Sequence, residues 1–318
     1  MREGIILGID TSNYTTSVAA ITVGGGLVAN IKRPLTVKAG ECGLRQADAV
    51  FAHIKNLPSA MQELKEHIDG KEILAVSVSE RPRNQEGSYM PCFLSGVAVA
   101  EGIASALGVD LYRVSHQCGH LMAGIYSSNR YELIERSFGA MHISGGTTEL
   151  LLCKYGENGF DATIVGGTKD LNAGQVIDRV GVKMGLSFPA GPMVEKLALE
   201  YQDKPINRRP STDGCFLNLS GLENIAEKLY EDTLDKNAVA HFVLRYLGRG
   251  IVEICQKFLE EYGDMPMLFA GGVMSNSIIK EMIGGAIKDS SFAEPSLSSD
   301  NAVGVAALGL LIYKNNTN

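Results

Sequence analysis

The chain has 318 residues, a length that favours two domains, although one large α/β domain also fits. Its formal net charge is −7, which argues against a free-standing nucleic-acid binder because neutralising phosphates takes concentrated lysine and arginine. The six cysteines form no C-x-x-C pair, no secretory signal opens the sequence, and no apolar run approaches the roughly 18 residues of a membrane helix. We therefore expect a cytoplasmic protein with no membrane segment.

The first half of the chain has a mixed strand and helix pattern. Hydrophobic patterning predicts three strands at residues 4–10, 15–23 and 27–31. A helix over about 47–68, a strand at 73–79, a helix over about 93–107 and a strand at 111–114 follow, before a helix that starts with His116. The predicted order is therefore βββαβαβα.

The second half repeats this pattern. Strands are predicted at 140–143, 148–154, 162–165 and 267–270, helices start near residues 173, 193, 275 and 300, and a long helix covers 237–262. Duplicated, RNase H-like βββαβαβ units build the two-lobed actin-like, sugar-kinase-like α/β fold, with nucleotide held in the cleft. We predict one lobe over 1–134, a second over 135–299 with a helical insertion at about 172–235, and a C-terminal helix, 300–318, that packs back on the first lobe.

Two histidines four residues apart, His116 and His120, would share one face of a helix and are candidate metal ligands. An ordinary core or surface role is the alternative. Zinc peptidases carry a glutamate general base after the first histidine, whereas Gln117 stands there, which disfavours a metallopeptidase. Asp300 is the candidate third ligand, since two imidazoles and a carboxylate suit iron or zinc; a helix N-cap is its alternative role.

Turns between strands supply the candidate phosphate contacts. Asp10, Thr11 and Ser12 end the first strand, and an ordinary Asx turn is the alternative there. The equivalent turn of the second half is glycine-rich, which lets backbone approach a ligand closely, although a tight hairpin turn explains it equally well. Its residues are Ser144, Gly145, Gly146, Thr147 and Thr148.

Two further segments suit a nucleoside. Asp178 is a candidate partner for a ribose diol, and the glycine turn of Phe-Pro-Ala-Gly191-Pro follows it along the chain. The Gly-Gly turn before Asn276 lies between a predicted strand and a helix and could cover an adenine and its ribose. A plain strand-to-helix connection is the alternative.

These residues, in this order, resemble the bacterial and archaeal tRNA N6-adenosine threonylcarbamoyltransferase family, formerly called O-sialoglycoprotein endopeptidases. The similarity spans nearly the whole chain. Besides the histidine pair, the matching pieces include His53 in AHIKNL and the D-x-x-x-G-x-x-x-D run from Asp170 to Asp178. The other pieces are GIDTSNYTTS, ISGGTTEL, FPAGP, LSGLEN, AGGVMSN and SDNA.

The resemblance implies transfer of the threonylcarbamoyl group from threonylcarbamoyl-adenylate to N6 of the adenine next to the anticodon of tRNA, with release of AMP. It implies one iron or zinc ion at His116, His120 and Asp300, with His142 as a further candidate ligand. It also implies that the Ser144–Thr148 loop contacts the ligand and that Asp178, Gly191 and Asn276 hold the adenylate, or ATP or AMP. The implied partners are tRNA, a threonylcarbamoyl-adenylate synthase, an accessory paralogue, an ATPase and a second copy of the chain.

Several positions depart from the family pattern. Residues 79–93 replace a Gly-Pro-Gly-Leu loop, and His142, Thr147, Leu171 and Gln175 also differ from many relatives. These changes indicate a diverged paralogue, so a catalytically weak nucleotide-binding protein that acts as a scaffold or regulator is the alternative function. The loop arginines Arg81, Arg83, Arg208 and Arg209 are the expected local contacts to tRNA.

Overall fold

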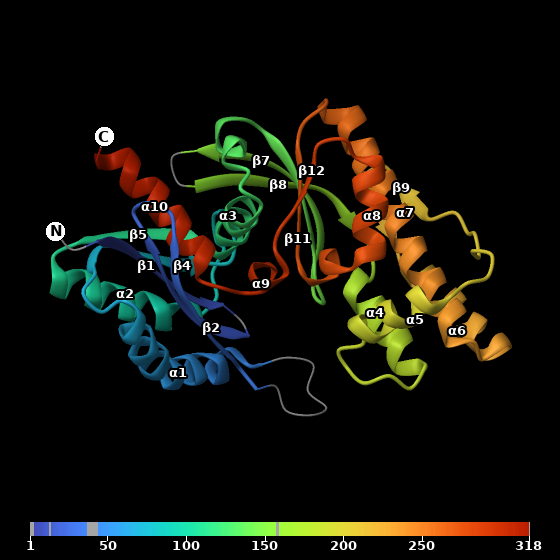
Figure 1. The fold of residues 1–318 in the computed structure, drawn as a ribbon, viewed down its shortest axis with the longest axis horizontal. Helices are drawn as coiled ribbons and strands as arrows, with labels where there is room; N and C mark the ends of the chain where they lie inside the picture. Colours follow the sequence, from blue (N-terminus) through green and yellow to red (C-terminus); the bar gives the residue numbers. More distant parts are fainter. Residues whose placement is uncertain (1–2, 13, 37–43, 157–158, 318) are drawn as a thin grey trace. The chain divides into compact units, whose positions relative to one another are not determined.

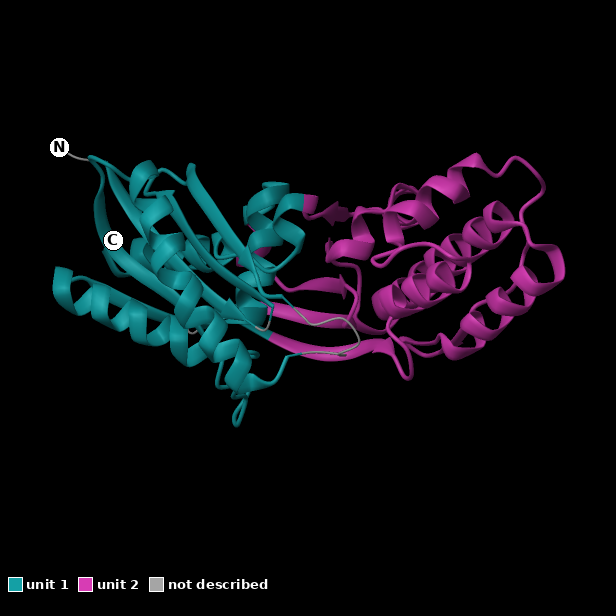
Figure 2. Cartoon of the chain, turned by 90° about the horizontal axis from the view of Figure 1, so that it is seen from below, with its two compact units in different colours: residues 1–131, 155–161, 296–318 teal, residues 132–154, 162–295 magenta. Residues whose placement is uncertain are grey.

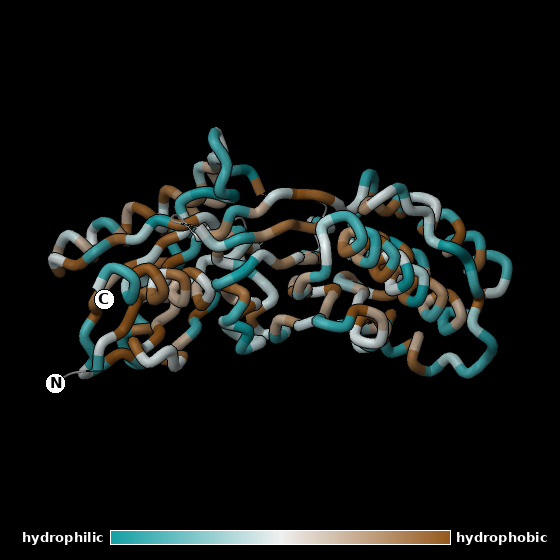
Figure 3. The backbone as a smooth tube through the Cα atoms, turned by 90° about the horizontal axis from the view of Figure 1, so that it is seen from above, coloured by the Kyte–Doolittle hydropathy of each residue, from teal (hydrophilic) through white to brown (hydrophobic). Residues whose placement is uncertain are grey.

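The computed structural model describes residues 3–12, 14–36, 44–156 and 159–317. The chain forms two compact units (Figure 2). Unit 1 comprises Met1–Tyr131, Tyr155–Asp161 and Ser296–Asn318, and unit 2 comprises Glu132–Lys154 and Ala162–Pro295. Helices of both units alternate between hydrophobic and hydrophilic stretches along the chain, as helices with one buried face do (Figure 3).

Unit 1 is built on a five-stranded sheet of order β3-β2-β1-β4-β5 (Figure 1). Strand β1 pairs antiparallel with β2 and parallel with β4. The predicted order βββαβαβα is confirmed. In chain order the elements are β1 (Gly4–Ser12), β2 (Thr15–Thr22), β3 (Leu27–Pro34), α1 (Gln46–His67), β4 (Glu72–Arg81), α2 (Phe93–Leu107), β5 (Asp110–Ser115) and α3 (His116–Ser128).

The two faces of this sheet pack against different helices, because neighbouring side chains of a strand point to opposite faces. Ile5, Leu7 and Ile9 of β1 share a buried cluster with residues of α1 and α2. The C-terminal helix α10 (Val303–Thr317) packs against β1, β2, β4 and α3. Residues of even number on β1 therefore face α10.

Unit 2 repeats the topology of unit 1. Its sheet has the order β12-β11-β6-β7-β8-β10-β9, in which β8-β7-β6-β11-β12 corresponds to β3-β2-β1-β4-β5. The last residues of β7 and the first residues of β8 belong to unit 1. The elements are η1 (Tyr131–Glu135), β6 (Phe138–Ile143), β7 (Thr148–Gly156), β8 (Gly159–Thr168), α4 (Ala173–Lys183), α5 (Gly191–Glu200), β9 (Ser211–Asp213), β10 (Phe216–Asn218), α6 (Ser220–Thr233), α7 (Lys236–Tyr262), β11 (Met267–Ala270), η2 (Gly272–Ser275), α8 (Ser277–Ala286) and β12 (Ser290–Phe292). The short helix α9 (Pro295–Ser298) begins at the last residue of unit 2 and continues into unit 1.

The longest element without its own prediction is α6, whose 14 residues fall within the predicted helical insertion over about 172–235, and the other missed elements are short. Strands β9, β10 and β12 have three residues each, too few to show a period of two. The last helix begins at Val303 rather than near residue 300.

The structure bears on two features of the composition, the cysteines and the apolar segments. The five cysteines in the described residues are free and buried, and Cys42 lies outside those residues. Among the helices that the structure describes, none combines the length and apolarity that crossing a bilayer requires.

Candidate metal centre and nucleotide pocket

The two histidines lie at the start of α3. The Ser115 hydroxyl caps this helix by accepting a hydrogen bond from the Cys118 amide at 3.2 Å. Because the helix begins at His116, that residue and His120 share one face, with ring centroids 4.4 Å apart and Nε2 atoms 3.0 Å apart. The expected helical pairing of the two imidazoles is confirmed.

Asp300 comes from the far end of the chain, just before α10. Its Oδ1 lies 3.6 Å from His116 Nε2 and 3.4 Å from His120 Nε2. Asn301 caps α10 instead, because its Oδ1 accepts hydrogen bonds from the amides of Val303 and Gly304 at 3.0 and 3.4 Å. The capping role considered for Asp300 is therefore wrong, and its carboxylate is directed at the histidines.

Helices α3 and α10 approach closely beside these three residues. A Cβ on Gly304 would overlap the carbonyl oxygen of Gly119, the residue directly before His120. Only glycine at position 304 permits this approach. The close packing of the two helices brings Asp300 to His116 and His120.

The three side chains fit a divalent transition metal. Their ligand atoms all lie within 4.8 Å of one another, in the one such cluster that the described residues contain. Ligand atoms about 2.1 Å from a common ion lie about 3.0 to 3.4 Å from each other in octahedral or tetrahedral coordination, close to the three distances between these atoms. Each side chain remains partly exposed, at 21, 12 and 25% of its surface for His116, His120 and Asp300. A substrate can therefore reach the cluster.

Asp10 orients the first histidine. His116 Nδ1 donates to Asp10 Oδ1 at 3.2 Å, which leaves Nε2 directed at His120 and Asp300. The same carboxylate accepts hydrogen bonds from the hydroxyls of Ser79 and of Ser12, the latter at 2.8 Å. A carboxylate in this position fixes the tautomer and the ring orientation of a metal-binding histidine. Asp10 is fully buried, so its carboxylate oxygens accept hydrogen bonds from groups within unit 1.

Thr11 lies on the opposite face of the sheet from Asp10. Its hydroxyl donates to the carbonyl oxygen of Cys92 at 3.1 Å and accepts from the Gly96 amide at 3.1 Å, both from the α2 side. Nearby, His53 of α1 is buried and its Nδ1 is hydrogen-bonded to the Thr16 hydroxyl at 2.8 Å. Contact of Asp10, Thr11 and Ser12 with phosphate stays a prediction.

A polar row across the sheet holds the segment that carries Asp300. Asp10 pairs with Ser17 on β2, and Ser17 pairs with Lys32 on β3, so the three side chains point to the same face. The Ser17 hydroxyl accepts from the Ala302 amide at 2.8 Å. Lys32 Nζ donates to the Ser299 hydroxyl at 2.7 Å and to a backbone carbonyl of the same segment. Nothing in the sequence alone marked Lys32, and Ser17 entered only as the last residue of the matching piece GIDTSNYTTS.

Electrostatics hold the cluster together when no cation is bound. Burial disfavours the imidazolium of His116, but the Asp10 carboxylate and then Asp300 outweigh it and raise the pKa of His116 to about 10. Burial of Asp300 acts to raise the pKa of its carboxyl, yet His116 and His120 hold that pKa well below its usual value. A metal cation bound at Nε2 of His116 would have to displace the proton there.

Unit 2 contains a pocket of about 390 Å³, a size typical of small-ligand sites. Asp178 lines it, and one carboxylate oxygen accepts from the Ala190 amide at 2.8 Å. The aromatic ring of Phe188 is 75% exposed beside it. Asn276 caps α8 through a hydrogen bond from the Ile279 amide at 3.1 Å. The lining residues are Gly145, Gly174, Ile177, Asp178, Phe188, Pro189, Gly191, Pro192, Glu195, Gly272, Val273, Ser275 and Asn276.

The pocket therefore brings together four of the predicted nucleotide-binding residues, Gly145, Asp178, Gly191 and Asn276. The glycine loop is a tight turn, closed by a hydrogen bond from the Ser144 amide to the Thr147 carbonyl oxygen at 2.9 Å. Helix α4 packs against this turn so tightly that a Cβ on Gly174 would lie 2.5 Å from the carbonyl oxygen of Ser144.

Other predicted contact residues lie outside this lining. Ser144, Gly146 and Thr147 are absent from the residues around the pocket, and Thr148 is buried with its hydroxyl accepting from the Ala173 amide at 2.9 Å. His142 lies on β6 of unit 2, paired with Glu149 of β7, and its contribution as a metal ligand stays a prediction.

The segment that departs from the family pattern lies beside the histidine helix. Its first residue, Ser79, is bonded to Asp10, and the carbonyl oxygen of Pro82 accepts from the Gln117 amide at 3.0 Å. Arg81 pairs with Glu80 and donates to Asn84. Substitutions in this segment therefore act on the start of α3.

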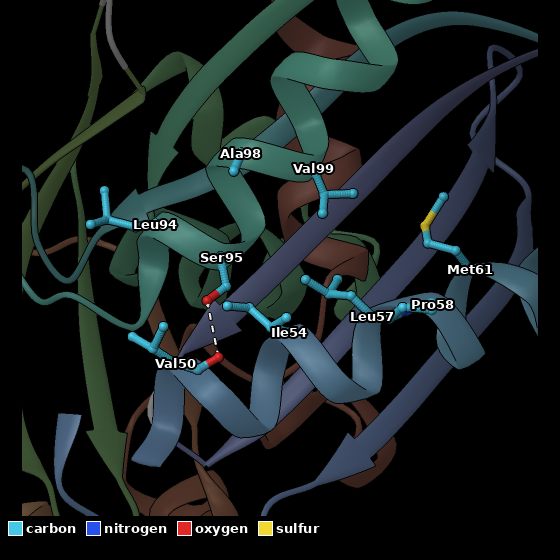
Figure 4. A pocket seen from close by; sticks show the side chains of 9 residues that line it. All are labelled: Val50, Ile54, Leu57, Pro58, Met61, Leu94, Ser95, Ala98 and Val99. Atoms are coloured by element: carbon cyan, nitrogen blue, oxygen red, sulfur yellow. Dashed lines mark hydrogen bonds between the residues drawn. The ribbon is translucent and has the colours of Figure 1, made fainter. Parts of the chain in front are cut away.

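A larger pocket of about 510 Å³ lies between α1 and α2 of unit 1 (Figure 4). Its lining is almost wholly apolar, with the Ser95 hydroxyl donating to the Val50 carbonyl oxygen at 3.4 Å. It lies on the sheet face opposite Asp10 and contains none of the candidate site residues.

Fold and site together define a class of protein. The fold is the two-unit α/β, actin-like class, in which one unit carries a His-His-Asp cluster that could hold a metal and the other carries a pocket of small-ligand size.

Comparison with known proteins supports this fold and the family resemblance of the sequence. Residues 28–307 match the sequence model of tRNA N6-adenosine threonylcarbamoyltransferase. A curated tRNA N6-adenosine threonylcarbamoyltransferase from Streptococcus suis is 29% identical over 331 aligned positions, covering 100% of this chain and 95% of that protein. HypF from T. kodakarensis superposes with a TM-score of 0.62 at 13% identity, covering 99% of this chain and 48% of HypF. The activator of 2-hydroxyisocaproyl-CoA dehydratase from Clostridium difficile, solved with bound ADPNP, superposes with a TM-score of 0.52 at 14% identity, covering 98% and 97% of the two chains.

The chain belongs to the tRNA N6-adenosine threonylcarbamoyltransferase family, a family of transferases. The predicted fold class and the predicted family are both confirmed.

Proposed function

We propose that this protein transfers the threonylcarbamoyl group from threonylcarbamoyl-adenylate to N6 of the adenine next to the anticodon in tRNA. In this reaction N6 forms a bond with the carbamoyl carbon, the bond from that carbon to the phosphate oxygen breaks, AMP leaves and one N6 proton passes to solvent. The observation that carries the proposal is the convergence of His116, His120 and Asp300 in a member of this transferase family.

The metal part of the proposal rests on the donor set. When bound, iron or zinc supplies a Lewis acid that polarises an oxygen of the activated group. His116 and His120 offer Nε2, and Asp300 offers a carboxylate oxygen. Asp10 keeps the proton of His116 on Nδ1 and so keeps Nε2 available. Three protein ligands leave coordination positions for substrate.

The nucleotide part rests on the pocket of unit 2. We assign the adenylate to this pocket, with Asp178 accepting hydrogen bonds from the ribose hydroxyls and Phe188 offering an aromatic face to the base. A bound adenylate carries its own leaving group, so no protein nucleophile is required. Placing both reactants supplies the rate enhancement that positioning gives.

A reconstituted transfer assay tests this function. The purified chain would be combined with a threonylcarbamoyl-adenylate synthase, an accessory paralogue and an ATPase, together with threonine, bicarbonate, ATP and an anticodon stem-loop RNA. Mass spectrometry of the digested RNA should detect threonylcarbamoyladenosine. His116→Ala and Asp300→Ala should abolish the product, whereas His67→Ala, which removes an exposed histidine of α1, should leave it unchanged.

Two results would refute the proposal. If the wild-type protein forms no product with any partner set, the chain is a nucleotide-binding scaffold or regulator of a cytoplasmic tRNA-modification complex. If His116→Ala retains full transfer, the histidine cluster is not part of the reaction.

A further inference from the structure

Helix α7 of unit 2 carries a row of three basic side chains. His241, Arg245 and Arg249 follow one another at four-residue intervals, which places them on one face of the helix. The ring of His241 lies 4.9 Å from that of Tyr201, and Arg249 Nη1 donates to Asn207 Oδ1 at 2.7 Å. This basic row therefore lies against the segment that joins α5 to β9.

Neither arginine has an acidic partner. No carboxylate of the described residues lies within 4.0 Å of Arg245 or Arg249, although the chain has more acidic than basic residues. Other arginines of unit 2 are neutralised: Arg179 pairs with Glu223 at 3.2 Å, and Arg209 with Glu253 at 3.7 Å. Arg245 and Arg249 form no ion pair of this kind among the described residues.

Some guanidinium nitrogens in the row also lack acceptors. Nε of Arg245, and Nε and Nη2 of Arg249, are buried without a hydrogen-bond partner among the described residues. Buried donors of this kind normally have partners, and leaving them unpaired costs free energy. The buried nitrogens themselves cannot contact a ligand outside the protein, but an anion near the partly exposed remainder of these side chains would offset their mutual repulsion.

The titration behaviour of the row agrees with that repulsion. Burial and then the charges of Arg245 and Arg249 lower the pKa of His241. Burial and then Arg245 lower the pKa of Arg249. Like charges four residues apart destabilise a helix, so the row lowers the stability of unit 2 unless an anion lies against it.

We propose that His241, Arg245 and Arg249 form a binding surface for the phosphate backbone of RNA, an inference that rests on the proposed function for the identity of the RNA. The row spans eight residues of helix, about 12 Å, which exceeds one phosphate group and suits successive phosphates of a chain. Arginine is well suited to phosphate because its guanidinium keeps its positive charge at any ordinary pH. Arg208, next to Asn207, extends the basic surface into the adjoining segment.

Salt-dependent RNA binding tests the surface. Affinity of the purified full-length chain for an anticodon stem-loop would be measured by fluorescence anisotropy over a range of salt concentrations. Arg245→Gln combined with Arg249→Gln should weaken binding by about tenfold or more at low salt and reduce the slope of log affinity against log salt by about 0.7 for each lost contact. Arg179→Gln combined with Lys183→Gln removes the same charge from ion-paired positions of unit 2 and should change neither value.

A charge-conserving variant and a competition with phosphate distinguish loss of RNA contacts from misfolding and from binding of a small anion. Arg245→Lys with Arg249→Lys keeps both charges and should retain most of the salt slope, which shows that lost charge rather than misfolding weakens the Gln variant. An unchanged slope in the Gln variant, or no RNA binding by the wild-type chain, would overturn the inference. Displacement of RNA by inorganic phosphate at equal phosphate concentration would instead identify a small-anion site.

The proposed function can fail independently. If RNA binding depends on the α7 row but no transfer occurs in the reconstituted assay, the RNA surface stands and the transfer proposal is wrong. If transfer occurs and the Gln variant binds RNA with the wild-type slope, only the surface is wrong.

Discussion

Metal binding by this protein should depend steeply on pH, because the proton of His116 must leave before Nε2 can bind a cation. The two carboxylates outweigh burial and raise the pKa of His116 to about 10 from 6.5. Each pH unit below that pKa lowers the apparent affinity about tenfold, or about 1.4 kcal/mol. Zinc affinity measured against a competing chelator should therefore rise by about 100-fold between about pH 6.5 and pH 8.5.

Asp10→Asn sharpens this prediction. At high pH the variant should bind zinc about 10- to 100-fold more weakly, as removal of an orienting carboxylate does. Loss of Asp10 also lowers the pKa of His116, so less proton competition opposes the metal at low pH. The affinities of wild type and variant should therefore converge as pH falls. Asp110→Asn, which changes an exposed carboxylate of β5, is the control and should match wild type.

Two outcomes would refute this reasoning. A zinc affinity that is independent of pH would show that His116 holds no proton in the metal-free protein. A wild-type to variant ratio that is the same at every pH would show that Asp10 does not act through the ionisation of His116. The metal-free protein provides a second check: a raised pKa stabilises the fold fully below pH 6.5, so its free energy of unfolding should fall as pH rises from 6.5 toward about 10.

Other predictions follow from single contacts. Lys32→Met should lower metal affinity and change the visible spectrum of the cobalt-loaded protein, because the segment carrying Asp300 loses its hydrogen bond to Lys32. Lys55→Met, at an exposed lysine, should do neither. An unaltered spectrum in Lys32→Met would show that this hydrogen bond does not position Asp300. Phe188→Ala should weaken AMP binding by about 1–3 kcal/mol in calorimetry, the usual worth of stacking on a base, without changing metal affinity. Asp170→Asn should destabilise the protein to urea by about 1–3 kcal/mol, because the carboxylate accepts bonds from backbone amides at the start of α6; equal stabilities would refute this. Those bonds outweigh burial and lower the pKa of Asp170, so their stabilisation is present above pH 3.8 and is lost as pH falls below it.

Local patterns were enough for the larger elements and for the histidine pair. The buried strands and long helices of both units follow from hydrophobic periodicity, and the sharing of one face by His116 and His120 follows from helical geometry once a helix starts after Ser115. The glycine turns and Asp178 could be proposed as nucleotide contacts from their residue types and the family resemblance, and the structure places Gly145, Asp178 and Gly191 around one pocket.

Contacts between distant segments could not be derived in this way. Asp300 has the residue type of both a helix cap and a metal ligand, and only the packing of α10 against α3 at Gly304 decides between them. The same holds for Asp10, whose place on the α10 face of the sheet depends on the register of β1 with its neighbours.

The sequence by itself determined the duplicated α/β architecture and the family, because strands, helices and short motifs are encoded by neighbouring residues. The tertiary structure alone decided which charges meet. It brings Asp10 and Asp300 to the histidines, holds Lys32 on the segment before α10, and leaves Arg245 and Arg249 without acidic partners among the described residues. The interaction between two charges depends on the distance between them in the folded protein, and the spacing of residues along the sequence does not give that distance.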